Sequence, residues 1–244
     1  MPALQRIPAY GMNESLELIS VGTLEVIGRL VDASNATLYG EVSSGAESMK
    51  VIYKPIAGER PLWDFQDGNL ASREVAAYKV SEIVGFHLVP RTVLRDGPFG
   101  FGSVQEWIEQ DENADVIALG HSDSPGIRSL ALFDVLINNT DRKFGHILLD
   151  KESRIFGCDH GVTFHSEPKL RTVLWQFAGL ELTSDEVNKL SAFESYLVEG
   201  SHEFDELLNP EEIAALRKRC RKLLQEKLFS YPSEEWPAVP WPPV

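Results

Sequence analysis

The chain has 244 residues, which is long enough for one large domain or for two smaller lobes around a cleft. Asp and Glu number 37 against 23 Lys and Arg, giving a formal net charge of −14. A charge of this sign repels nucleic acid and anionic membrane surfaces, so the composition argues against both as partners.

The N-terminal stretch, MPALQRIPAYGMNESLEL, has no basic segment followed by an apolar one, as a secretory signal would have. No apolar run reaches the roughly 18 residues that a membrane-spanning helix needs. We therefore expect a cytoplasmic protein without integral membrane association. A leader of about fifteen residues is expected before the first strand.

Three strand-like runs come next, in the order LEVIGRLV from Leu24, ATLYGEV from Ala36 and MKVIYK from Met49. Short connections predict an antiparallel meander. The first connection, DASN, has small side chains and free backbone N–H groups. Ser34, Asn35 and Thr37 there can offer hydroxyl and amide donors to an anion, although a plain hairpin turn would have the same composition.

A helix is predicted from Asn69 to Val80, with Gly85 as a stop signal. A second hairpin is predicted from two runs, residues 89–95 and 101–108, joined across Asp96-Gly97-Pro98. The acidic, turn-rich segment EQDENAD then separates this β-rich region from the helical remainder.

The stretch from Phe133 to Gly161 carries the densest chemical pattern, FDVLINNTDRKFGHILLDKESRIFGCDHG. An apolar helix pattern enters a polar loop that contains Asp141 and Lys143. Two short apolar runs, HILLD and RIFGCD, follow with a turn between them. If these runs pair as a hairpin, its open ends fall at His146 and Asp159. Three polar groups then meet beside the loop, although Asp141 and Asp159 taken singly are also common turn and cap residues.

Beyond Gly161 the pattern is helical. Helices are predicted within 170–177, from residue 184 or 185 to about Val198, and after Asn209-Pro210-Glu211-Glu212. The last start has an N-cap residue, a proline in the first turn and two acids at the positive end of the helix dipole. The end of the chain, YPSEEWPAVPWPPV, cannot continue a helix because of its prolines.

The order of residues in the central stretch resembles the catalytic loop and metal motif of the protein-kinase superfamily. Asp141, Lys143 and His146 stand where that loop has Asp, Lys and Asn, and Asp159-His160-Gly161 stands where the superfamily has Asp-x-Gly. The separations, 18 residues from Asp141 to Asp159 and 13 from His146 to Asp159, also agree. The stretch is similar to the atypical HipA-type and phosphoinositide-kinase-like branches, and in detail to an actinobacterial family named phosphatidylinositol-kinase-like.

This resemblance implies an α+β, two-lobed kinase-like fold, with an antiparallel β-rich N-lobe and a mainly helical C-lobe. The N-lobe would span residues 16–108, with a hinge near 105–109. The C-lobe would span 109–231 with its catalytic loop at 138–146 and its metal motif at 158–161, and a Pro/Trp-rich tail would follow at 232–244.

The resemblance also implies roles for residues of the first lobe. Lys54, at the end of the third strand, would hold the α and β phosphates of ATP against Glu74, although a solvated helix glutamate is the simpler alternative for Glu74. The turn with Ser34, Asn35 and Thr37 would cover the phosphates. Backbone groups near Gln105, Glu106 and Trp107 would meet adenine.

In the second lobe, Asp141 would accept the proton of the acceptor hydroxyl and Lys143 would neutralise the γ-phosphate. Asp159 and His146 would hold a divalent metal, Mg²⁺ or Mn²⁺. The alternative is that His146 only hydrogen-bonds the loop while Asp159 alone carries the ion. The implied activity is that of an atypical ATP-dependent kinase, acting on protein Ser/Thr or on itself. A nucleotide-binding pseudokinase or scaffold, and a small-molecule or phosphoinositide kinase, are the alternatives. The acceptor, a protein or a small molecule, is not specified by the sequence.

Overall fold

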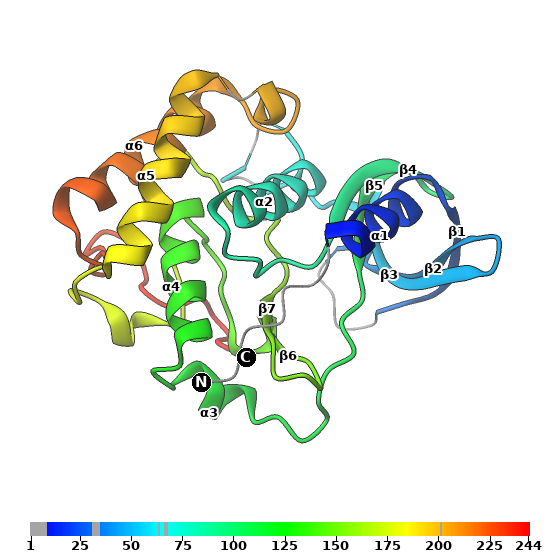
Figure 1. Ribbon diagram of the computed structural model, residues 1–244, viewed down its shortest axis with the longest axis horizontal. Coiled ribbons are helices and arrows are strands. Elements are labelled where there is room, and N and C mark those ends of the chain that lie inside the picture. The colour runs from blue at the N-terminus through cyan, green and yellow to red at the C-terminus, as the bar shows by residue number, and fades with distance from the viewer. Residues whose placement is uncertain (1–8, 31–34, 63, 66–67, 201) are drawn as a thin grey trace. The chain divides into compact units, whose positions relative to one another are not determined.

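The computed structural model describes residues 9–30, 35–62, 64–65, 68–200 and 202–244, with side chains from residue 14 onward. The chain divides into two compact units. The first contains the residues up to Arg60 together with Arg91–Trp107, and the second contains Pro61–Pro90 and Ile108–Val244. Figure 1 shows the elements of each unit.

The first unit is built on a five-stranded antiparallel sheet with the strand order β1-β2-β3-β5-β4. The meander and the second hairpin predicted from sequence are both confirmed. The strands are β1 (Thr23–Arg29), β2 (Leu38–Ser44), β3 (Glu47–Pro55), β4 (Thr92–Gly97) and β5 (Gly100–Glu106), and a short 3₁₀ turn, η1 (Ile56–Gly58), follows β3.

Helix α1 (Ala9–Val21) packs on one face of this sheet, where Figure 1 shows it crossing the strands. Leu18 and Ile19 of the helix share a core with inward-facing strand residues; the strand members are Leu24, Val42, Val51, Tyr53 and Val104. The part of the expected leader that the structure describes, from Ala9 onward, is therefore helical. Its helix is stabilised by burial against the sheet, a long-range contact that the local pattern does not show.

The second unit is mainly helical and has the larger core. Helices α4, α5 and α6 lie side by side in Figure 1, and the apolar faces of α2, α4, α5 and α6 meet in one buried cluster. The α-helices are α2 (Leu70–Val84), α3 (Val116–Gly120), α4 (Pro125–Ile137), α5 (Ser184–Glu199) and α6 (Pro210–Glu226). The remaining elements are the hairpin β6 (Ile147–Leu149) and β7 (Ile155–Gly157), and the 3₁₀ turns η2 (Phe144–His146), η3 (Trp175–Phe177) and η4 (His202–Phe204).

Helix ends in this unit follow the capping signals of the sequence. The Asn209 side chain accepts the N–H of Glu212, and the Glu212 carboxylate accepts the N–H of Asn209, which is a capping box. The Thr183 hydroxyl and the Glu186 side chain cap α5 in the same way. These reciprocal bonds satisfy backbone donors that the first turn of a helix leaves unpaired, so the predicted starts of both helices are confirmed.

The helix predicted within residues 170–177 is wrong as an α-helix, because only the 3₁₀ turn Trp175–Phe177 forms there. The preceding backbone is committed elsewhere: Arg142 and Thr172 form a parallel bridge, so this segment lies extended along the polar loop. Helix α2 belongs by its contacts to the helical unit, whereas the division of the chain at residue 108 follows sequence order and stays a prediction. No helix of the described residues is long and apolar enough to span a bilayer.

Candidate active site

The polar loop begins where α4 ends. Asn138 takes the left-handed conformation, with a φ of 54°, at the C-cap of α4. Its side-chain amide donates to the carbonyls of His165 and Glu167, and its side-chain oxygen accepts the N–H of Lys169. An asparagine suits this position because it tolerates a positive φ better than most residues. The turn thus ends the helix and anchors the segment after the metal motif.

Arg142 is the structural centre of the loop. Its guanidinium is fully buried and pairs with Asp134 of α4, with an Nη2–Oδ1 distance of 3.0 Å. Its Nη1 donates to two carbonyls, His146 O at 3.2 Å and Cys158 O at 3.1 Å. These carbonyls stand at the two open ends of the β6–β7 hairpin. Arg142 therefore holds the ends of the hairpin together, with its charge balanced by Asp134.

The predicted hairpin is confirmed, with Ile147 pairing Gly157 at its open end. His146 and Asp159 meet there, with 3.5 Å between His146 Nε2 and Asp159 Oδ2. Asp159 has a φ of 58°, a left-handed conformation that is uncommon outside glycine. Such a backbone, held by its surroundings, is typical of a functional position, and here the carboxylate lies beside the imidazole.

Asp141 and Lys143 also come together, with 3.3 Å between Lys143 Nζ and Asp141 Oδ2. Burial raises the pKa of the Asp141 carboxyl; the positive charge of Lys143 opposes this, and the negative charge of Asp159 adds to it. The net pKa lies above the ordinary value for Asp. A carboxylate with increased proton affinity is better suited to accept a proton than an exposed one.

Glu74 reaches the metal motif from α2. The backbone N–H of His160 donates to Glu74 Oε2 at 3.0 Å, and Glu74 is buried. The neighbouring Arg73 pairs with Glu212 of α6, with an Nη2–Oε1 distance of 2.6 Å. Helix α2 is therefore tied both to the metal motif and to the start of α6, and a solvated surface role for Glu74 does not agree with its burial.

The other predicted nucleotide contacts lie in the first unit. Lys54 pairs with Ser103 across β3 and β5. Asn35 accepts the N–H of Arg60 through its side-chain oxygen, and Thr37 is buried. Ser34 lies outside the described residues. Lys54 and Glu74 belong to different units, so their pairing stays a prediction.

Several hydrogen-bonding groups of the residues predicted to contact adenine are already bonded to other residues of the sheet. The Gln105 side chain donates to Thr92 Oγ1 at 2.7 Å, and Glu106 pairs with Arg91. The backbone N–H of Glu106 donates to Arg91 O, and that of Trp107 donates to Lys50 O. An adenine contact at these residues would have to use other backbone groups, and the assignment stays a prediction.

The donor set at the hairpin end fits a metal held partly by its substrate. Within the part of the chain that the structure describes, no group of three or more His, Cys, Asp or Glu side chains is arranged to hold a metal. His146 and Asp159 offer one imidazole and one carboxylate. A Mg²⁺ ion that binds together with a nucleotide usually takes only one or two protein ligands, and phosphate oxygens and water complete its coordination.

Arg142 and Asp134 are the site residues that the sequence did not reveal. One signal was present, because Asp134 stands in an otherwise apolar helix and a buried carboxylate requires a partner. The pattern could not name that partner among the three cations of the second unit nearest in sequence, Arg128, Arg142 and Lys143. Only the fold shows that Arg142 turns inward while Lys143 turns to Asp141.

Several solved structures share the fold of this chain. The structure of hydra Fam20 with sugar matches with a TM-score of 0.59 at 13% identity, covering 92% of this chain and 90% of that one. The Golgi casein kinase matches with a TM-score of 0.58 at 13% identity over 91% of this chain and 75% of that one. Its form with Mn and ADP bound also gives 0.58, at 13% identity over 90% and 76% of the two chains. The chain therefore has the two-lobed α+β fold of the kinase-like superfamily, as predicted.

One relative places the chain more narrowly. Protein Rv2133c of Mycobacterium tuberculosis is 38% identical over an alignment 263 positions long, which covers 92% of this chain and 94% of that protein. The chain belongs to the family of Rv2133c. No protein-family profile matches the sequence.

Proposed function

We propose that this protein is an atypical ATP-dependent kinase that transfers the γ-phosphoryl group to a hydroxyl of a protein Ser or Thr, or of the protein itself. One observation carries the proposal: two pairs, Asp141 with Lys143 and His146 with Asp159, form in one unit at kinase-like spacing. Phosphoryl transfer depends on positioning and charge neutralisation, and these pairs supply both.

In this proposal Asp141 orients the acceptor hydroxyl and accepts its proton as the oxygen attacks phosphorus. Lys143, 3.3 Å from that carboxylate, neutralises the γ-phosphate. The raised pKa of Asp141 supports its role, because proton transfer is most efficient when the base is not too weak.

His146 and Asp159 would hold the divalent metal. The bound metal would neutralise the charge of the β and γ phosphates. Imidazole is a better ligand for Mn²⁺ than for Mg²⁺, which prefers an octahedron of oxygens, so Mn²⁺ is the expected ion. Binding of Mn and ADP by the Golgi casein kinase, which shares the fold, supports this choice.

The remaining nucleotide contacts are proposed for both units. Lys54 would hold the α and β phosphates, and Glu74 would orient it. Ser34, Asn35 and Thr37 would approach the phosphates, and the segment Gln105–Trp107 would face adenine. The buried carboxylate of Glu74 supports its part, because a buried charge needs partners.

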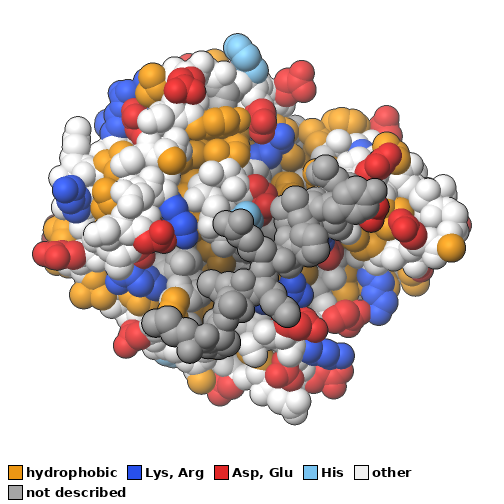
Figure 2. All heavy atoms as spheres, in the orientation of Figure 1, with side chains coloured by type: hydrophobic (Ala, Val, Ile, Leu, Met, Phe, Trp, Pro, Cys, Tyr) orange, Lys and Arg blue, Asp and Glu red, His pale blue; other side chains and the backbone are white. Residues whose placement is uncertain are grey.

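We place the protein among the HipA-type and phosphoinositide-kinase-like branches on the pattern of the loop 138–146, and in the cytoplasm. The net charge of −14 favours a protein or small-molecule acceptor over nucleic acid or an anionic lipid surface. On the face shown in Figure 2, acidic and basic side chains of the described residues are interspersed, without a broad basic patch.

The test is incubation of the purified protein with γ-labelled ATP and Mn²⁺, followed by detection of labelled protein and ADP. Asp141→Asn should lower transfer by about 100-fold or more while ATP still raises the melting temperature. The matched control is Asp185→Asn, at an exposed position on α5, which should transfer normally.

Binding of ATP without any labelled product or ADP would instead identify a nucleotide-binding scaffold. Labelling of a phosphoinositide in mixed vesicles, with no labelled protein, would identify a lipid kinase.

A further inference from the structure

A second cation, Arg171, lies beside Asp141 and has no part in the roles assigned above. Its backbone is bonded to the loop on both sides of that residue. The N–H of Arg171 donates to Asn139 O at 2.9 Å, and the carbonyl of Arg171 accepts the N–H of Arg142 at 3.1 Å. Residue 171 is thus fixed against the catalytic loop by the chain itself.

The register between the loop and the segment around residue 171 places the side chains of Asp141 and Arg171 on the same face. Arg142 and Thr172 form a parallel bridge, and both side chains bond the buried Asp134. Because successive side chains of an extended chain alternate, Asp141 and Arg171 project together from the opposite face. In agreement with this geometry, the charge of Arg171 is among the influences on the Asp141 carboxyl.

The Arg171 guanidinium retains an unused donor. Its Nε is buried, and no group of the described residues accepts a hydrogen bond from it. A buried donor without an acceptor is unfavourable in the protein alone, so a movement of the side chain that brought this N–H to a ligand oxygen would be favoured. Guanidinium groups bind phosphate oxygens readily, because their donors match the geometry of the oxyanion.

Trp236 of the Pro/Trp-rich tail covers this cation. The Arg171 guanidinium lies 5.8 Å from the centroid of the Trp236 ring, and the Lys169 ammonium lies 4.6 Å from it. Contacts of this kind stabilise a cation against an aromatic face and limit its rotamers. The buried ammonium of Lys169 is paired with Asp64 and Glu167. Of the two cations, Arg171 is the one whose charge acts on the Asp141 carboxyl.

Backbone bonds hold the tail itself in place. Ala238 O accepts the N–H of Thr172 at 3.1 Å and the indole N–H of Trp175 at 2.7 Å. Pro243 O accepts the N–H of Phe144, which lies between Lys143 and His146, at 2.9 Å. The tail therefore contacts the catalytic loop directly, as well as the cation beside it.

We propose that Arg171 binds the phosphoryl group during transfer and that Trp236 holds Arg171 in position for it; this inference rests on the proposed kinase function. In the transfer step the acceptor oxygen forms a bond to the γ-phosphorus, and the bond from that phosphorus to the β–γ bridging oxygen breaks. ADP leaves with the electron pair, and the hydroxyl proton passes to Asp141. Arg171 forms no covalent bond; it neutralises charge on the oxygens of the phosphoryl group in the transition state.

The test compares the binding of ADP with Mn²⁺, in the presence and absence of aluminium fluoride, which mimics the transferring phosphoryl group. The native protein should bind the aluminium fluoride complex about 100-fold more tightly than ADP alone, as transition-state analogues do. Arg171→Gln should lose about tenfold or more of this gain while its affinity for ADP is unchanged. Arg171→Lys should retain part of it, as a point charge without the fork of donors.

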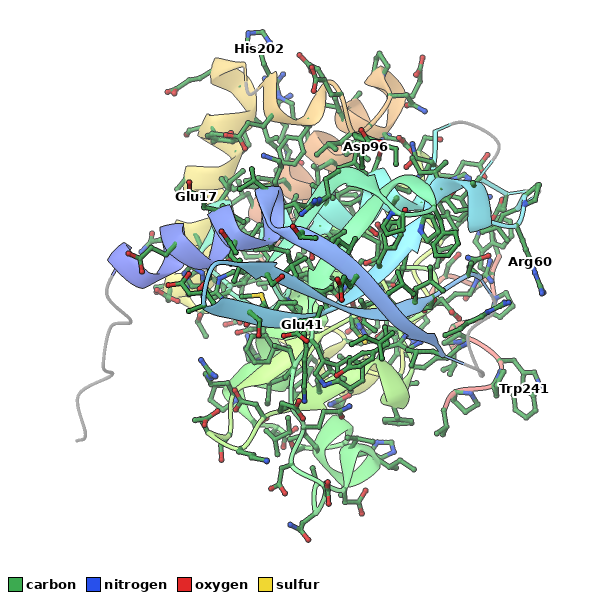
Figure 3. All side chains as sticks on the ribbon, turned by 90° about the vertical axis from the view of Figure 1, so that its right-hand side faces the viewer. Glu17, Glu41, Arg60, Asp96, His202 and Trp241 are labelled. Atoms are coloured by element: carbon green, nitrogen blue, oxygen red, sulfur yellow. The ribbon has the colours of Figure 1, made fainter. Side chains whose placement is uncertain are left out.

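The role of Trp236 is tested in the same assay. Trp236→Ala should lose much of the gain, and Trp236→Phe should restore most of it, because Phe keeps an aromatic face. Trp241→Ala is the matched control in the same tail, since its side chain is 90% exposed and projects outward in Figure 3. It should behave as the native protein.

The outcomes separate the two proposals. Absence of ADP binding by the native protein would overturn the kinase function, and the inference with it. Equal binding of ADP with and without aluminium fluoride would contradict a role of the site in transfer. A native preference for the fluoride complex that persists fully in Arg171→Gln and in Trp236→Ala would leave the kinase function standing and refute the inference. Should Arg171→Gln fail to fold, the comparison of Trp236→Ala with Trp236→Phe decides.

Discussion

At the scale of single residues, the site contains partly buried charged groups that destabilise the fold, and oppositely charged neighbours that offset part of this cost. Asp141 is the clearest example. Burial raises the pKa of its carboxyl, so the ionised form that a base requires is the form that the folded state disfavours. With Asp141 in its proposed role as base, function and stability place opposite demands on this side chain.

Asp141→Asn is consequently expected to raise the stability of the protein near neutral pH. A carboxyl whose folded pKa is raised stabilises the fold below its unfolded pKa of about 3.9, and that contribution is lost as pH rises through the folded pKa. Asn resembles the protonated form at every pH. Urea unfolding should therefore show a higher free energy for the variant near neutral pH, with the difference shrinking as pH falls. A variant less stable than the native protein at neutral pH would contradict the assignment.

His146 sets the expected choice of metal. With the imidazole beside Asp159 at 3.5 Å, transfer should be faster with Mn²⁺ than with Mg²⁺. His146→Asn supplies an amide oxygen and should shift the preference towards Mg²⁺. Initial rates with each ion measure the ratio.

His202→Asn is the control for this substitution, because His202 lies in the exposed turn η4 (Figure 3) and should leave the ratio of rates unchanged. Equal rates with both ions in the native protein, unaltered by His146→Asn, would mean that His146 only hydrogen-bonds the loop.

At the scale of elements, the packing of β5 on β3 controls where Lys54 lies. Gly102 faces the backbone of Lys54 and Pro55, and a Cβ at Gly102 would stand 2.6 Å from Pro55 Cα. Backbone cannot move aside as a flexible side chain can. The strand therefore requires glycine at this point, for close approach rather than for an unusual φ.

Gly102→Ala should destabilise the protein by about 1–3 kcal/mol through overpacking, and should weaken ATP binding by displacing Lys54. Gly28→Ala in β1 is the matched control, since a Cβ there meets nothing within 4 Å. Its effect on stability should be within about 0.5 kcal/mol. Unfolding in urea and an ATP titration measure both effects. Equal behaviour of the two variants would show that the sheet adjusts freely at Gly102.

The elements that sequence predicted are those with local signals. Caps at Asn69, Thr183 and Asn209 mark helix starts, and alternating apolar residues mark the strands. Helix α1 was not predicted, and it is stabilised by the burial of Leu18 and Ile19 on the sheet. The segment 170–174 is apolar enough for a helix, yet its backbone groups bond the loop 138–146 and the tail instead.

The same distinction applies to the site. The spacing of Asp141, His146 and Asp159 follows from one local hairpin, and the structure brings His146 and Asp159 together at its end. Arg142 pairs with Asp134 across the end of α4, where the sequence offers several nearby cations, and Arg171 contacts the tail, which is distant in sequence. Periodicity and spacing carry no information on such register, so neither arginine could be assigned from the chain alone.

At the scale of the whole molecule, each unit has its own buried core. Helix α2 shares the core of the helical unit through Ala76, Ala77 and Val80. Its neighbours in sequence, the strands on either side, belong to the other unit. Cores of this kind commonly open as separate cooperative units, so the stability of α2 should follow that of α5 and α6.

Phe193→Ala in α5 tests this expectation by hydrogen exchange. Phe193 is fully buried, and its truncation should cost about 3–5 kcal/mol. Amides of Leu70–Val84 should then exchange faster together with those of α5 and α6, while the sheet amides change little. Val104→Ala, in the core of the sheet, should give the reverse pattern. Protection of α2 that survives Phe193→Ala would place the helix with the sheet instead.

Because Glu212 makes two contacts, the charges of its ion pair with Arg73 cannot be exchanged between the two positions without loss of other hydrogen bonds. The carboxylate receives the Arg73 guanidinium at 2.6 Å and also the N–H of Asn209, which caps α6. Arg73 in turn donates to Asn69 O at the start of α2. A charge-swapped protein, Arg73→Glu with Glu212→Arg, would keep the attraction but lose an acceptor at one helix end and a donor at the other. The charge-swapped protein is therefore expected to be less stable than the native one, by about 1–2 kcal/mol for the lost cap, although the two charges still attract.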